Sequence, residues 1–370
     1  MIGERLKQAR ELSSMTQEQL AEIVGVEQTT IARIERDAFK PRDELVELLA
    51  TATRFPRDFF DLPVETEFPF GSLTYRKYAK TKAEYKKLSH RLAQQAFELS
   101  ELFAAKMKPI NVGLPRSLDE DPVSAARIVR SALGVDPTSP IKNLMQRIEK
   151  IGVRIFKLPV EIPDVDAFSI VVEGRTPVIA VNSTRHGDRQ NFSLAHELGH
   201  LVLHFPLTGR QDDIEVEANR FAGELLLPEE AMRTELVPPV TLTLLAELKT
   251  RWRVSMAALL QRAKELDIVT ERQHKYLRMQ LAQRDWLREE PVPIQPENPR
   301  VLRKMAEVAY GTPSNVRKIA KTSKRPPFLV AQLLDMTVAT DGENGKILGF
   351  PKTEISKASE NTKASELAEA

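Results

Sequence analysis

The sequence predicts a mostly α-helical α+β protein, with a helical N-terminal domain, a second domain that holds a small sheet and one long functional helix, and a helical C-terminal region. Three observations predict this class. Short amphipathic helical patterns fill residues 1–62. Three β-type runs, at 153–156, 167–172 and 178–181, precede two longer helical patterns. From residue 271 to 340 the pattern is again helical.

Composition and charge exclude several classes of protein. The chain has 370 residues, of which 42% are hydrophobic and 29% charged, so two or three globular domains are expected. It has no cysteine, which excludes disulfides, thiolate metal sites and a cysteine nucleophile. The net charge of +2 gives no bulk signal for nucleic acid or membranes. The sequence starts without a basic-then-apolar leader and has no apolar run near the ~18 residues of a membrane span, so a cytoplasmic protein with no membrane partner is expected.

Shifts in composition divide the chain into five parts. Between Arg76 and Lys108 nine basic residues stand against three acids, which predicts a basic linker helix. A proline-rich break at Pro291–Pro299 interrupts the later helices. The end of the chain has almost no apolar residues and is expected to be disordered. The predicted parts are the helical domain at 1–62, the linker helix at 63–122, the domain with the sheet at 123–270, the helical C-terminal region at 271–340 and the tail at 341–370.

The first motif, at residues 16–35, has the features of two helices joined by a tight turn. Thr16 is a suitable N-cap, and Gln19 stands three residues later as its capping-box partner. Gly25 can take the positive φ that ends a first helix. We expect Val26 and Ile31 to pack back onto Leu20 and Ile23.

The start of the second helix then carries polar side chains that can reach base edges and phosphates in a major groove. The candidate DNA-contacting residues are Gln17, Gln28, Thr29, Thr30 and Arg33.

Residues 1–60 resemble the Xre/Cro/lambda-repressor family of DNA-binding domains. The resemblance implies a lambda-repressor-like helical fold, a double-stranded DNA operator as partner and a homodimer that reads a pseudo-palindrome. One departure is Asp37-Ala38, where the family usually has glycine; aspartate tolerates the left-handed conformation. The alternative is a helical interaction module without DNA contact, which the nine basic and eleven acidic side chains of residues 1–60 favour a little.

The second motif is HExxH within the helical pattern at about 191–204. His196 and His200 stand four residues apart, so both imidazoles project from one face of a helix and can hold one metal ion. Glu197 lies beside that face and can take a proton from water as the catalytic base. The alternative is a pair of surface histidines on an amphipathic helix.

A catalytic zinc site needs a third protein ligand. On the next helical pattern, at about 213–226, Ala218 marks the buried side, and Glu215 lies three residues before it on that side. Glu217 points away and is expected to be an exposed helix acid. We therefore predict Glu215 as the third ligand and Asn219 as an acceptor that orients a ligand histidine.

Residues 140–270 resemble the ImmA/IrrE family of metallo-endopeptidases. The match includes the Asn191–Ala195 lead-in, HELGH, and Glu-x-x-Ala-Asn-x-Phe-Ala followed by Leu-Leu-Leu-Pro. The resemblance implies a gluzincin-like fold with Zn²⁺ on His196, His200 and Glu215, Glu197 as general base, and cleavage of a repressor protein. Ala167 stands where the family often has glycine. The strand at 168–172 could be the edge that pairs with an extended peptide.

The two motifs together predict a DNA-binding transcriptional regulator that carries a zinc-dependent endopeptidase. Proteolysis of a partner regulator or of the chain itself would then switch transcription. The alternative is a non-catalytic regulator, an antitoxin included, whose zincin-like domain only senses a ligand. Three further features have plainer interpretations. His204 is expected to be a packed helix histidine, residues 244–268 a helix-turn-helix-like packing subdomain, and the basic stretch 317–325 a solvated face that could also touch DNA phosphates.

Overall fold

The computed structural model describes residues 1–64, 68, 82–108, 111–115, 120–159, 162–163, 165–172, 176–182, 186–205 and 211–336. Its contacts divide the chain into two compact units. Of the described residues, unit 1 contains 1–64, 82–107 and 305–336, and unit 2 contains 68 and those of 108–304. The predicted disordered tail at 341–370 lies outside the described residues. Among the described helices, none combines the length and the hydropathy that crossing a membrane requires.

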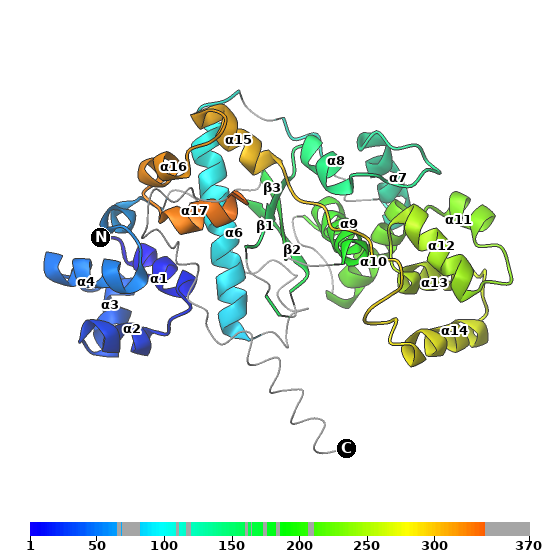
Figure 1. Cartoon of the computed structure of the whole chain (residues 1–370), viewed down its shortest axis with the longest axis horizontal. Helices are drawn as coiled ribbons and strands as arrows, with labels where there is room; N and C mark the ends of the chain where they lie inside the picture. Colours follow the sequence, from blue (N-terminus) through cyan, green and yellow to red (C-terminus); the bar gives the residue numbers. More distant parts are fainter. Residues whose placement is uncertain are drawn as a thin grey trace, which may run out of the picture. The chain divides into compact units, whose positions relative to one another are not determined.

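Unit 1 begins with a bundle of short helices, drawn in blue in Figure 1. Thr16 and Gln19 form the predicted capping box at the start of the second helix, and Gly25 ends that helix with a φ of 72°. Asp37 takes a left-handed φ of 56°, and its carboxylate accepts a hydrogen bond from the Gly3 amide at 2.7 Å. The elements are α1 (Gly3–Leu12), α2 (Gln17–Val24), α3 (Gln28–Glu35), α4 (Asp43–Thr53) and the 3-10 helix η1 (Arg57–Asp61).

The predicted packing of this bundle is wrong at one position. Leu20 and Ile31 are buried, as expected, but the side chain of Ile23 is 57% exposed. Val24 is buried in its place. Leu20 stays on the buried face, so that face is turned only by about half a residue, or roughly 50°, from Leu20 and Ile23 toward Leu20 and Val24.

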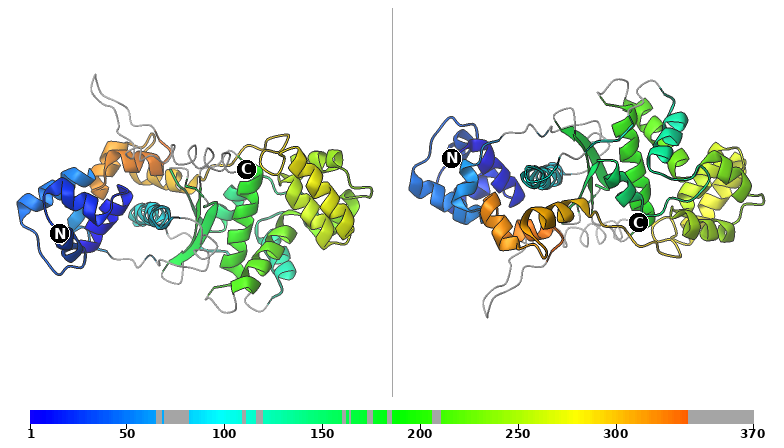
Figure 2. Two further views of the ribbon diagram at one scale, coloured as in Figure 1. Left: turned by 90° about the horizontal axis from the view of Figure 1, so that it is seen from below. Right: turned by 90° about the horizontal axis from the view of Figure 1, so that it is seen from above.

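Unit 1 is completed by segments from much later in the chain: α6 (Ala83–Ala104), α15 (Val301–Tyr310), of which residues from Met305 lie in this unit, α16 (Val316–Ser323) and α17 (Pro327–Leu333). Both views of Figure 2 show the orange C-terminal helices beside the blue N-terminal ones. Buried ion pairs connect α6 to both the N-terminal helices and the C-terminal segment. The Arg5 guanidinium donates to the Glu98 carboxylate of α6 at 2.8 Å, and Arg325 donates to the same carboxylate.

Unit 2 contains a three-stranded sheet and the helices that cover it. The strands β1 (Arg154–Lys157), β2 (Ala167–Val172) and β3 (Thr176–Val181) lie in the order β1-β3-β2, with β1 parallel and β2 antiparallel to β3. All three predicted β-runs are thus strands. The helices are α7 (Pro122–Ala132), α8 (Leu144–Lys150), α9 (Gly187–Leu203), α10 (Gln211–Leu226), α11 (Glu229–Glu235), α12 (Leu242–Trp252), α13 (Met256–Glu265) and α14 (Glu271–Gln283).

The helices α9 and α10 form the centre of unit 2 and lie side by side in Figure 1. They approach closely at Gly199, because a Cβ atom added there would come within 2.9 Å of the Phe221 ring. Phe221 itself is fully buried in the core. Strand β2 packs on α9 and occupies an edge of the described sheet. The helix α9 therefore contacts both the edge strand β2 and the helix α10.

Candidate metal centre and DNA-reading helices

Donor atoms of three side chains converge between α9 and α10. The Nε2 atoms of His196 and His200 lie 3.1 Å apart. The two carboxylate oxygens of Glu215 lie 3.3 Å from His196 Nε2 and 3.4 Å from His200 Nε2. Both imidazoles are buried, and the Glu215 side chain is 21% exposed. The structure thus brings together all three residues that the sequence predicts as metal ligands.

The donor set fits a zinc ion. Zinc takes histidine nitrogen and carboxylate oxygen at about 2.0–2.2 Å, and neighbouring donors of a tetrahedron with those bonds lie about 3.3–3.6 Å apart. The closest separations between the side chains, 3.1, 3.3 and 3.4 Å, are close to that range, with a different oxygen of Glu215 nearest to each histidine. Three protein ligands leave the fourth position of a tetrahedral ion for water or substrate.

In each candidate ligand histidine, the ring nitrogen that faces away from the donor cluster contacts another side chain. His196 Nδ1 lies 2.9 Å from Asn219 Oδ1, the contact that the sequence predicts for Asn219. His200 Nδ1 lies 3.1 Å from His204 Nδ1. His204 is buried as expected of a packed histidine, and burial holds its pKa below the usual range against the opposing effect of Glu217. The neutral ring that results can both donate and accept one hydrogen bond.

The interpretation of Glu217 as an uninvolved surface acid needs correction. Its side chain is 46% exposed, yet its Oε2 atom accepts a hydrogen bond from His204 Nε2 at 2.8 Å. Glu217 reaches His204 because that residue follows the last turn of α9, beyond the two candidate ligands. The face of α10 that approaches α9 is therefore wider than the apolar pattern suggested.

The candidate base, Glu197, is buried beside the donor cluster. Its Oε2 atom accepts a hydrogen bond of 2.7 Å from the hydroxyl of Ser169 on the edge strand β2. Sequence reasoning missed Ser169, although a single hydroxyl within the otherwise apolar run Ala167–Val172 was an available signal. The contact fixes the carboxylate of Glu197 relative to both the helix and the strand.

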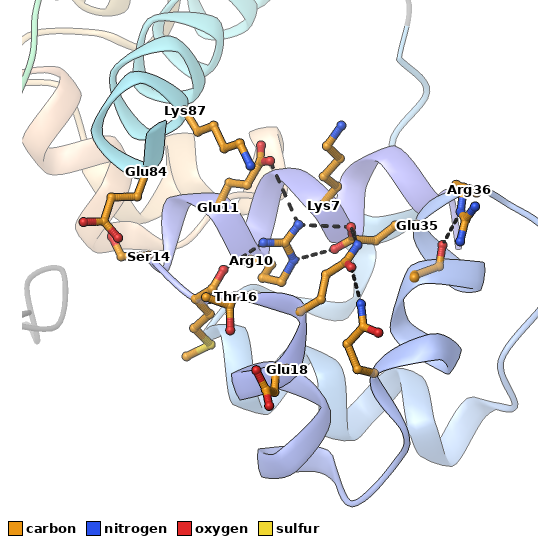
Figure 3. Close-up of a pocket in the computed structure, with 14 residues that line it drawn as sticks. Lys7, Arg10, Glu11, Ser14, Thr16, Glu18, Glu35, Arg36, Glu84 and Lys87 are labelled. Atoms are coloured by element: carbon orange, nitrogen blue, oxygen red, sulfur yellow. Dashed lines mark hydrogen bonds and ion pairs between the residues drawn. The ribbon is translucent and has the colours of Figure 1, made fainter. Parts of the chain in front are cut away.

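In unit 1 the predicted DNA-contacting residues lie at the start of α2 and along α3, with Arg33 in the last turn of α3. Gln28 donates from its amide to Gln17 Oε1 at 2.7 Å, and Gln17 in turn donates to Glu35 Oε2 at 2.7 Å. Arg10 Nε also donates a buried hydrogen bond of 2.5 Å to Glu35 Oε1. Figure 3 shows the Arg10 guanidinium between Glu35 and Glu11. The two glutamines are thus oriented by a buried ion pair.

The remaining candidates lie on the exposed side of α3. Thr29 and Arg33 are exposed and Thr30 is half-buried. The Arg33 guanidinium stacks over the Phe39 ring, 5.6 Å from its centroid. A cavity of about 680 Å³ opens beside these helices, with Gln17 and Gln28 in its wall and Glu84 and Lys87 contributed by α6. The structure therefore keeps all five candidates near one edge of the bundle.

The geometry defines a regulator-type protein in which a helix-turn-helix domain is fused to a domain with a peptidase-type His/His/Glu cluster. Comparison with known families gives the same two parts. Residues 6–60 match the model of the Helix-turn-helix family, and residues 148–264 match the model of the IrrE N-terminal-like domain, which is a peptidase family. No curated protein matches the chain.

Proposed function

We propose that this protein is a DNA-binding transcriptional regulator whose zinc-dependent endopeptidase domain cleaves a regulatory protein, either a repressor or the chain itself. The observation that carries the proposal is the convergence of His196, His200 and Glu215, whose nearest donor atoms lie within 3.4 Å of one another. Glu197, the residue after His196, is buried. The helix-turn-helix domain in the same chain links this chemistry to transcription.

In the proposed reaction His196, His200 and Glu215 hold the ion, and Glu197 is the general base. A bound zinc ion supplies polarisation of a peptide carbonyl and acidification of water. Glu197 accepts a proton from water as the hydroxyl oxygen bonds to the carbonyl carbon. It then returns that proton to the amide nitrogen as the C–N bond breaks, so that one carboxylate serves both steps. The hydrogen bond from Ser169 keeps this carboxylate in place. Strand β2, at the edge of the described sheet, offers main-chain groups to an extended peptide.

The peptidase half of the proposal is tested with Glu197→Gln. Purified wild-type protein is expected to contain about one zinc ion per chain, and the variant should keep its zinc while losing cleavage. Comparison of cleaved regulators in cells that carry either protein identifies the substrate. Glu230→Gln, a change at an exposed residue of α11, is the control that should behave like wild type. Absence of zinc, together with an unchanged regulatory output of Glu197→Gln, would contradict the proposal.

The DNA-binding half is tested with a pool of random duplexes from which the purified protein selects its operator. A homodimer is expected to select two half-sites about one helical turn, roughly 34–36 Å, apart. Thr29→Ala on α3 should weaken binding to the selected duplex, whereas Thr51→Ala, on the exposed face of α4, should not. Selection of no sequence, or equal effects of the two substitutions, would contradict reading by α3.

A further inference from the structure

At the end of α9 a series of hydrogen-bonded side chains has no role in the proposed peptide hydrolysis. His200 contacts His204, and His204 contacts Glu217 of α10, with distances of 3.1 Å and 2.8 Å. His204 is 4% exposed, so both of its ring nitrogens are satisfied inside the protein. The series runs from the candidate metal centre to a carboxylate that is 46% exposed.

The direction of these hydrogen bonds follows from the donor atoms. His200 Nε2 faces His196 Nε2 and Glu215, so this nitrogen would hold a metal ion and the ring proton would then sit on Nδ1. His200 Nδ1–H then donates to His204 Nδ1, which leaves the proton of a neutral His204 on Nε2. That Nε2–H donates to the Glu217 carboxylate. With a metal ion on His200 Nε2 and Glu217 as an acceptor, each donor of this series has an acceptor.

We propose that His204 and Glu217 are positioning residues that fix the ring of His200 for metal binding and make it a stronger ligand. The proposal rests on the metal site proposed above and deepens it. A carboxylate behind a ligand imidazole orients the ring and raises its basicity, and removal of such a partner typically lowers metal affinity about 10–100-fold. Here an intervening imidazole carries this effect from Glu217 to His200.

The two ligand histidines are thereby supported by different chemistry. His196 is backed by the neutral amide of Asn219 at 2.9 Å, whereas His200 is backed by an imidazole and an anion. His204 directly follows α9, four residues after His200, which lets the two rings meet on one side of the helix end. Loss of Glu217 should therefore weaken the hold on His200 without disturbing the Asn219 contact.

The experiment measures the affinity of the purified full-length protein for Zn²⁺ and Co²⁺ by competition with a chelator. Glu217→Gln and His204→Asn are each expected to bind both ions about 10–100-fold more weakly than wild type. Glu230→Gln makes the same change of charge at an exposed position of α11 and should bind like wild type. Because Glu217 is half-exposed, its substitution tests the proposal even if His204→Asn fails to fold.

A second readout is the tautomer of His204 in the zinc-loaded protein. Nitrogen-15 spectra of the six histidines are expected to show His204 protonated at Nε2 and His200 at Nδ1. Equal affinities of Glu217→Gln and wild type, or a His204 ring protonated at Nδ1, would overturn the inference. If wild-type protein binds neither ion, the proposed metal site itself fails, and the two failures are thus distinguishable.

Discussion

Single contacts decide the electrostatics of the candidate centre. Glu197, the residue after His196 on α9, is buried, and the hydroxyl of Ser169 is the hydrogen-bond donor that the edge strand contributes to it. A hydrogen bond to a charged acceptor is worth more than one between neutral groups, about 1.5–3 kcal/mol. The position of the base therefore depends on a residue of the sheet as well as on its own helix.

Ser169→Ala is expected to lower kcat of the peptidase reaction about 10-fold, because Glu197 loses the bond that holds it, while zinc affinity stays the same. Steady-state kinetics on the identified substrate and a zinc titration measure the two effects. Ser131→Ala, on the exposed surface of α7, is the matched control. A parallel loss of zinc affinity in Ser169→Ala would show that Ser169 supports the fold of the site instead.

Glu149 gives a pH dependence to stability. Burial raises the pKa of this carboxyl above its usual value of 4.5, against the hydrogen bonds that it accepts from the amides of Val301 and Arg300. A group whose folded pKa is raised binds more protons in the folded state, so its contribution to stability falls as the pH rises from 4.5 through the folded pKa. Relative to Glu149→Gln, wild-type protein should lose stability over that window. Urea unfolding between pH 4.5 and 7 measures the difference, and a rising or constant difference would contradict the assignment.

At the residue scale, sequence spacing was sufficient for some predictions and not for others. The spacing of HExxH and of the apolar stripe on α10 places His196, His200 and Glu215 correctly on their faces, because helix periodicity fixes which residues share a face. The contacts of Glu217 and Ser169 could not be predicted in this way, because their partners come from other elements. A helical period cannot show that His204 lies within reach of α10 or that β2 passes beside Glu197.

At the scale of elements, the approach of α9 to α10 depends on the small residue inside HELGH. A Cβ at Gly199 would lie 2.9 Å from Cδ1 and 3.2 Å from Cγ of Phe221, so a methyl group there pushes the helices apart. Because the donor cluster is shared between these helices, their spacing sets the distances between its atoms. The close packing at Gly199 is thus needed for the observed geometry of the donor cluster.

Gly199→Ala is expected to destabilise unit 2 by about 1–3 kcal/mol through overpacking. In a Phe221→Ala background the same substitution should cost clearly less, because the ring atoms that the new methyl group meets are gone. Denaturant unfolding of the four proteins in this double-mutant cycle measures the coupling. Equal costs in the two backgrounds would show that the ring of Phe221 is not what the methyl group meets.

Most elements could be predicted from the sequence, and their bounds agree with it to within a few residues. The strand predicted at 167–172 is β2, and the helices predicted at about 191–204 and 213–226 are α9 and α10. Within the stretch 63–122, predicted as a linker helix, the structure describes the shorter helix α6, whose packing could not be foreseen. Its polar residues Gln95 and Glu98 meet Arg325, more than 220 positions later, and no local pattern reports contacts of that range.

At the scale of the whole molecule, unit 1 is assembled from segments that unit 2 separates along the chain. The charge on Glu98 is central to it, because both Arg5 and Arg325 donate to its carboxylate. Arg325 is almost completely buried, and this burial lowers its pKa to about 10 despite the neighbouring carboxylate. At neutral pH it is a buried cation that depends on this partner.

Glu98→Gln is expected to destabilise unit 1 by about 3–5 kcal/mol, because it leaves two buried guanidinium groups without their counter-ion. Glu84→Gln is the matched control on the same helix, at an exposed position, and should have an effect within about 0.5 kcal/mol. Hydrogen exchange of α1 and α6 amides measures unit 1 separately from unit 2. Equal exchange rates in the two variants would contradict the role of Glu98.

Because unit 1 is built from segments before and after unit 2 in the sequence, cleavage of the polypeptide has a particular consequence. A single nick anywhere between Lys108 and Lys304 would break the covalent path between α6 and α16, but Glu98 would still bind Arg325 across the break. The two chain fragments would remain one folded unit, as complementing fragments do. If the protein does cleave itself, hydrolysis alone does not free its N-terminal helices, and release requires that a buried ion pair also be pulled apart.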